Sequence, residues 1–91
     1  MEFQKEPGRI YALGEDGKLL AEITFPTGED GVADIDHTFV DESLRGQGVA
    51  GQLVRAAADQ IRDQGKKARA VCTYARAWFD RHPEQADLLE G

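Results

Sequence analysis

Three glycines and an arginine stand directly ahead of a strongly helical segment, in the stretch LRGQGVAGQL at residues 44–53. Each glycine weakens local structure by leaving the backbone free, so something must require it. The first amides of a helix have no intrahelical acceptor, and the helix dipole places partial positive charge on them. Because Gly46, Gly48 and Gly51 lack Cβ atoms, phosphate oxygens could reach these amides, with Arg45 as a charged donor. The stretch predicts binding of a diphosphate; the alternative is that the glycines only shape a loop.

The spacing differs from two common phosphate-binding motifs, because no GK[ST] closes it and its glycines are out of register with GxGxxG. The longer stretch FVDESLRGQGVAGQLV instead resembles motif A of the GCN5-related N-acetyltransferases. The core of that motif is an arginine or glutamine, any two residues, a glycine, any one residue, and then a glycine or alanine. The resemblance implies that the diphosphate of acetyl-CoA binds here and that the preceding strand pairs with its pantetheine arm. The coenzyme-binding residues implied in this way are Phe39, Val40, Arg45, Gly46, Gln47, Gly48, Val49, Ala50 and Gly51.

The chain as a whole also resembles a narrower group of small GCN5-like domains with the patterns HT.V....RGQG.A and C.YA......HPE. The first pattern begins here at His37 and the second at Cys72, and agreement extends from about residue 9 to residue 89. Such domains are similar to acetyltransferases trimmed to the coenzyme-binding half. The resemblance implies transfer of acetyl from acetyl-CoA to an amine, on a small molecule or a protein. The alternative is a coenzyme-binding or protein-interaction module without turnover.

Acetyl transfer to an amine requires a deprotonated nucleophile, a donor for the thioester oxygen and a proton source for the departing thiolate. Backbone amides near Phe39 and Val40 are expected to polarise the thioester, and Tyr74 to supply the proton. In a second route the Cys72 thiol accepts the acetyl group, with His37 as the base. The structural alternatives are that Tyr74 is an ordinary half-buried aromatic residue and Cys72 a small core residue.

The elements that must position these residues follow from hydrophobic periodicity and turn residues. Alternating segments predict strands, and apolar residues at helical spacing predict helices. The predicted elements are strands at 9–13, 18–25, 32–40 and 68–72, a helix with apolar positions from Val49 to Ile61 and Gly65 as its C′ residue, and a helix at 74–81. Because a strand, helix, strand order needs a crossover, the last two strands are expected to be parallel. The predicted fold is α/β, a small mixed sheet made of an antiparallel meander and a parallel pair with helices packed on it. The resemblance implies a truncated form of the acyl-CoA N-acyltransferase fold.

Alternation along residues 32–40 predicts which side chains share a face of the sheet. His37 and Phe39 are expected beside Ile35, with Asp34 and Asp36 on the opposite face. On this interpretation His37 is either the catalytic base or a hydrogen-bonded core histidine.

Composition limits the remaining functions. The 91 residues predict a single domain, and the net charge of −6 argues against a general nucleic-acid binder. One cysteine excludes an intramolecular disulfide and favours the cytoplasm, and the two separated histidines predict no metal site. No apolar segment is long enough to span a membrane. We expect a monomer or weak homodimer whose partners are acetyl-CoA and an amine acceptor.

Overall fold

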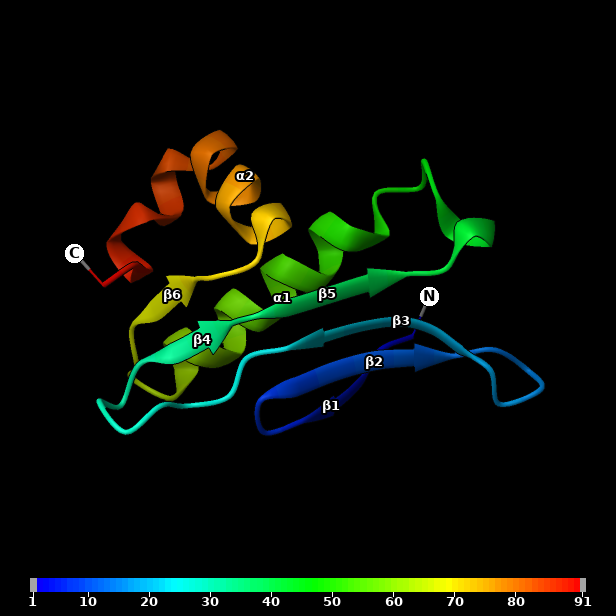
Figure 1. The fold of residues 1–91 in the computed structure, drawn as a ribbon, viewed down its shortest axis with the longest axis horizontal. Coiled ribbons are helices and arrows are strands. Elements are labelled where there is room, and N and C mark those ends of the chain that lie inside the picture. Colours follow the sequence, from blue (N-terminus) through cyan, green and yellow to red (C-terminus); the bar gives the residue numbers. More distant parts are fainter. Residues whose placement is uncertain (1, 91) are drawn as a thin grey trace.

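Six short strands form two connected sheets in the computed structural model, which describes residues 2–90 (Figure 1). An antiparallel sheet has the order β1-β2-β3-β5, and β4 and β6 form a parallel pair. The strands are β1 (Gln4–Glu6), β2 (Arg9–Leu13), β3 (Leu19–Thr24), β4 (Ala33–Ile35), β5 (His37–Val40) and β6 (Ala68–Ala70). The predicted combination of a meander and a parallel pair is confirmed.

Two α-helices and two 3-10 helices complete the chain. They are η1 (Glu42–Leu44), α1 (Val49–Asp63), α2 (Thr73–Arg81) and η2 (Pro83–Leu88). The apolar residues of α1 recur at helical spacing, so that Leu53, Val54 and Ile61 are buried on one stripe. Gly65 follows the helix with φ +70°, the left-handed conformation that commonly ends helices. No helix within residues 2–90 is long and apolar enough to cross a membrane.

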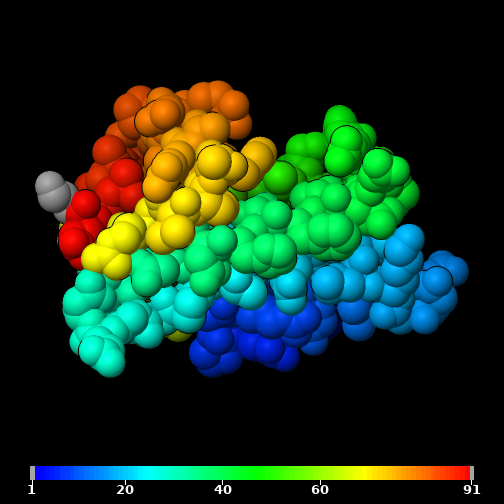
Figure 2. All heavy atoms as spheres, viewed as in Figure 1, coloured from blue at the N-terminus to red at the C-terminus, as the bar shows by residue number. Residues whose placement is uncertain are grey.

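The core lies between α1 and one face of the antiparallel sheet. Ile10 of β2 and Ile23 of β3 are completely buried on this face, and Trp78 and Phe79 of α2 complete the same cluster. The opposite face of the sheet carries residues such as Tyr11 and is only partly buried. No helix of the described chain covers that face, which is turned to the viewer in Figure 2.

The segment predicted as one strand at 32–40 is divided at Asp36. Its first part, β4, pairs with β6, whereas its second part, β5, pairs with β3. Ile35 is fully buried, but the side chains of both Asp36 and His37 are exposed, so the alternation slips by one residue here. The prediction that His37 and Phe39 share the buried face of Ile35 is therefore wrong. The same observation excludes the alternative that His37 is a hydrogen-bonded core residue.

Other boundaries differ little from the prediction. Residues 9–13 form β2 as expected, whereas β1 was not predicted. The strand expected to reach Cys72 ends at Ala70, and Cys72 instead stands at the N-cap position of α2.

Candidate functional site

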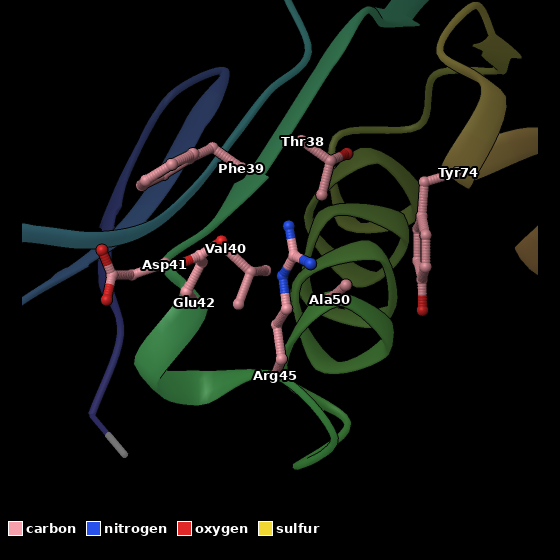
Figure 3. A pocket seen from close by; sticks show the side chains of 8 residues that line it. All are labelled: Thr38, Phe39, Val40, Asp41, Glu42, Arg45, Ala50 and Tyr74. Atoms are coloured by element: carbon pink, nitrogen blue, oxygen red, sulfur yellow. The ribbon is translucent and has the colours of Figure 1, made fainter.

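A cavity of about 480 Å³ opens where the end of β5 meets the start of α1 (Figure 3). A second cavity, of about 230 Å³, extends along the glycine turn. Val40, Arg45, Ala50 and Tyr74 line both cavities, so the two adjoin and form one site. The larger is also lined by Thr38, Phe39, Asp41 and Glu42, and the smaller by Leu44, Gly46, Gly48 and Val49.

One wall of the site is the free edge of β5. The amide of Asp41 donates to the carbonyl oxygen of Leu20 at 2.8 Å, which continues the register of β3 and β5. Because backbone groups alternate in an antiparallel pair, those of Thr38 and Val40 point away from β3. On that side β6 has already ended, and no described strand pairs with β5 there. The edge therefore offers unpaired backbone donors and acceptors to a ligand.

The second wall is the start of α1, where the chain requires glycine. Gly46 has φ +80° and Gly48 φ +74°, and a Cβ atom at either position would meet no atom within 4 Å. The left-handed backbone, and not crowding, thus explains these two glycines. Gly48 provides no side-chain cap, and the first helical hydrogen bond runs from the amide of Gln52 to its carbonyl oxygen. The intervening amides have no intrahelical acceptor and can bind an anion.

The other two residues predicted from the glycine stretch have different surroundings. A Cβ atom at Gly51 would lie 3.6 Å from the hydroxyl oxygen of Tyr74 and 3.9 Å from the indole of Trp78. Gly51 therefore lies where α2 packs on α1. Gln47 is exposed, and its side-chain amide donates to the carbonyl oxygen of Ser43 at 3.4 Å.

Arg45 brings positive charge into the site. Its guanidinium group reaches between Val40 and Ala50 in Figure 3. It makes no ion pair with any carboxylate of residues 2–90. Asp41 also lines the larger cavity, and the hydroxyl of Ser43 donates to its carboxylate at 2.6 Å, which lowers the pKa of that carboxyl group. In Figure 3 that carboxylate points away from Arg45, and it lies 3.4 Å from the Nζ atom of Lys18. Arg45 is therefore the charged group that an anionic ligand would meet in the site.

Cys72 and Tyr74 reach the site from the start of α2. The Cys72 sulfur lies 3.4 Å from the hydroxyl oxygen of Thr38 and accepts a hydrogen bond from the Ala75 amide, also at 3.4 Å. It therefore caps α2 and touches a residue that lines the larger cavity. Tyr74 lines both cavities directly. Thr38 was missed as a site residue, although it belongs to the HT.V pattern.

His37 is directed to the other side of the sheet. Its Nε2 atom lies 3.4 Å from the Oε1 atom of Glu22 on β3. Neighbouring residues of a strand point to opposite faces, and Thr38 faces the cavity and Cys72. The structure thus does not bring His37 and Cys72 together on one face, and the predicted pairing of base and thiol is not supported by this geometry.

Comparison with known proteins identifies the family. The profile described as "GCN5-related N-acetyl-transferase" matches residues 9–88. The chain belongs to this family. The predicted resemblance is confirmed, and so is the α/β fold. Members of the GCN5-related family typically use acetyl-CoA, which agrees with a cavity that has an anion-binding helix start.

Individual relatives cover the chain to different extents. Protein NATD1 of Gallus gallus is 33% identical over 52 residues, which are 57% of this chain and 47% of that protein. The chain thus matches about half the length of these curated relatives. A GCN5-like protein from Staphylococcus aureus has a solution structure that covers 99% of this chain and 88% of its own, with TM-score 0.79 and 29% identity. A ribosomal-protein-alanine N-acetyltransferase from Brucella melitensis, 21% identical with TM-score 0.56, shares the fold over 81% of this chain and 60% of its own.

Proposed function

We propose that this protein binds acetyl-CoA in the cavity between β5 and α1 and transfers the acetyl group to an amine. One observation carries the proposal: a single site combines a free strand edge, an uncapped helix start and an unpaired arginine. These three features match the chemistry of coenzyme A, which has amides along its pantetheine arm and a diphosphate at the end of that arm.

The diphosphate would bind at the start of α1. Its oxygens can accept hydrogen bonds from the amides that follow Gly48, and Arg45 adds an ionic contact. The pantetheine amides would pair with the backbone of Thr38 and Val40, as an added strand pairs with a sheet edge. The thioester would then lie near Thr38, beside the start of α2.

The chemistry follows from this placement. A neutral amine attacks the thioester carbon, forming the C–N bond while the carbonyl electrons move to oxygen, where a backbone amide of the β5 edge stabilises the charge. Collapse of this intermediate breaks the C–S bond, and the sulfur keeps the electron pair. Tyr74 gives its proton to the thiolate, and the proton lost by the amine returns to Tyr74 through solvent. The products are an N-acetyl amine and coenzyme A.

Cys72 supports a second route to the same products. Its thiolate would attack the thioester first and release coenzyme A, and the amine would then take the acetyl group from the cysteine. The contact between its sulfur and Thr38 favours this route, whereas its role as the cap of α2 is purely structural. Intact mass after incubation with acetyl-CoA separates the two: the covalent route gives an acetyl adduct that is absent from Cys72→Ala.

Calorimetric titration with acetyl-CoA tests the proposed site. Arg45→Glu should weaken binding strongly, because it replaces the cation facing the diphosphate with an anion. Lys5→Glu on β1 is the matched control, because it changes the net charge equally at a position away from both cavities. Equal affinity in the two variants would contradict the site. Binding without coenzyme A release over a panel of amines would identify a coenzyme-binding module without turnover.

A further inference from the structure

Glu22 lies at the centre of a polar network on the open face of the sheet. Its Oε2 atom accepts a hydrogen bond from the Nε atom of Arg9 at 2.6 Å, and its Oε1 atom lies 3.4 Å from the Nε2 atom of His37. The Arg9 guanidinium also lies over the ring of Tyr11, 3.8 Å from its centre. The Glu22 side chain is 17% exposed and that of His37 52%. The carboxylate is thus held from one side, while the imidazole that it contacts remains accessible.

This network lies on the opposite side of β5 from the cavity. His37 and Thr38 are adjacent, so one residue faces the network and the next faces the cavity. Helices α1 and α2 pack on the cavity side, whereas the face of His37 carries no helix of the described chain (Figures 1 and 2). A second substrate can therefore approach β5 from the face of His37 without displacing a helix, while the coenzyme occupies the cavity on the other side.

We infer that Glu22 is a positioning residue that holds His37 as the proton acceptor for the incoming amine. This inference rests on the proposed acetyl transfer. In the tautomer that carries its proton on Nε2, the atom 3.4 Å from Glu22, the Nδ1 atom has a free lone pair. A protonated amine gives one proton to Nδ1, and the imidazolium then releases that proton to solvent. The resulting neutral amine attacks the thioester as described above, so His37 ends each cycle unchanged.

The charges around His37 suit a cationic acceptor. Glu22 faces it from β3, with Arg9 of β2 beyond it, and Glu6 of β1 lies 3.6 Å from that arginine. Asp36 is adjacent in the chain, and its carboxylate accepts a hydrogen bond from the hydroxyl of Thr24 at 2.6 Å. Three carboxylates and one arginine give this face a net negative charge when His37 is neutral. That charge attracts an ammonium group.

The test compares the wild-type protein with Glu22→Gln, His37→Gln and the control His82→Gln. His82 is the only other histidine, and it stacks on Trp78 in α2, away from the network. Coenzyme A release is followed from about pH 5 to pH 9 with spermidine, a lysine-containing peptide and an aminoglycoside as acceptors. His37→Gln should lower kcat/KM about 100-fold and abolish the acid limb of its pH profile. Glu22→Gln should lower kcat by a smaller factor with KM unchanged, because the imidazole is then held less firmly while the acceptor still binds.

Two further measurements separate the outcomes. Circular dichroism checks that each variant is folded, and calorimetry should give equal acetyl-CoA affinity in all four proteins because the network lies outside both cavities. Turnover by His37→Gln with the wild-type rate and acid limb would overturn this inference alone. A wild-type protein that does not bind acetyl-CoA, or that acetylates no acceptor, would refute the proposed function and with it this inference.

Discussion

Replacing Gly48 by alanine should destabilise the fold through backbone conformation alone. Gly48 has φ +74° and ψ +15° at the N-cap of α1, and a Cβ atom there would meet nothing within 4 Å. An L-residue in this left-handed region costs roughly 1–2 kcal/mol. For a chain of this size, each kcal/mol lowers the unfolding temperature by about 4–8 °C. Gly48→Asn should cost less, because asparagine enters this region more readily.

Gly51→Ala provides a matched control of opposite sign. Gly51 lies inside α1, where alanine is favoured over glycine by about 1 kcal/mol. The added Cβ atom would lie 3.6 Å from the hydroxyl oxygen of Tyr74, which is an ordinary van der Waals contact. Two glycine-to-alanine changes three residues apart should therefore differ by about 2–3 kcal/mol in the free energy of unfolding.

Urea denaturation followed by far-ultraviolet circular dichroism measures both free energies. The fluorescence of Trp78, the single tryptophan, gives an independent transition because its side chain is 2% exposed in the folded protein. If Gly48→Ala were as stable as the wild type, the left-handed backbone would not be a reason for glycine at this position. Access of phosphate to the backbone would then be the remaining reason. Destabilisation by Gly51→Ala would show that α1 and α2 pack more tightly than these distances indicate.

Three other variants test separate parts of the structure. Cys72→Ser should keep a side-chain cap on α2, whereas Cys72→Ala should lower the free energy of unfolding measured in urea by about 1 kcal/mol. Loss of acetyl transfer in both variants would indicate thiol chemistry. Arg69 donates to Asp30 at 2.8 Å and lowers its pKa, so the ion pair stabilises the fold above about pH 4 and is lost as the carboxylate protonates below that pH. Thermal unfolding of Arg69→Gln should accordingly depend less on pH between about pH 5 and pH 2 than that of the wild type. Tyr74→Phe should bind acetyl-CoA with nearly unchanged affinity but release coenzyme A more slowly, and an unchanged rate would exclude its hydroxyl as the proton donor.

Local signals in the sequence were enough to predict the start of α1. The positive φ angles at Gly46 and Gly48 occur at residues that permit them, and the buried residues of α1 recur at helical spacing from Val49 to Ile61. Strand β1 was harder, because its residues Gln4–Glu6 are all exposed and show no alternation. It is defined only by its pairing with β2, which is a tertiary property.

The site residues that were missed depend on contacts between strands. Thr38 is part of the site because the register of β5 with β3 turns its backbone outward, and register cannot be derived from periodicity within one strand. Glu22 contacts His37 across the same pair of strands. Both residues stood in segments correctly predicted to be extended, but their partners were not predictable from local sequence.

The slip at Asp36 produces several of these features together. With uninterrupted alternation, His37 and Phe39 would lie under α1 with Ile35, and Thr38 would point to the open face. Because two consecutive side chains face outward, the sheet instead turns Thr38 toward the cavity and His37 toward the open face. The same break ends the pairing with β6, which leaves the edge of β5 free directly before the glycine turn. No glycine or proline marks this position, so hydrophobic periodicity and turn residues do not reveal the break in the strand at Asp36.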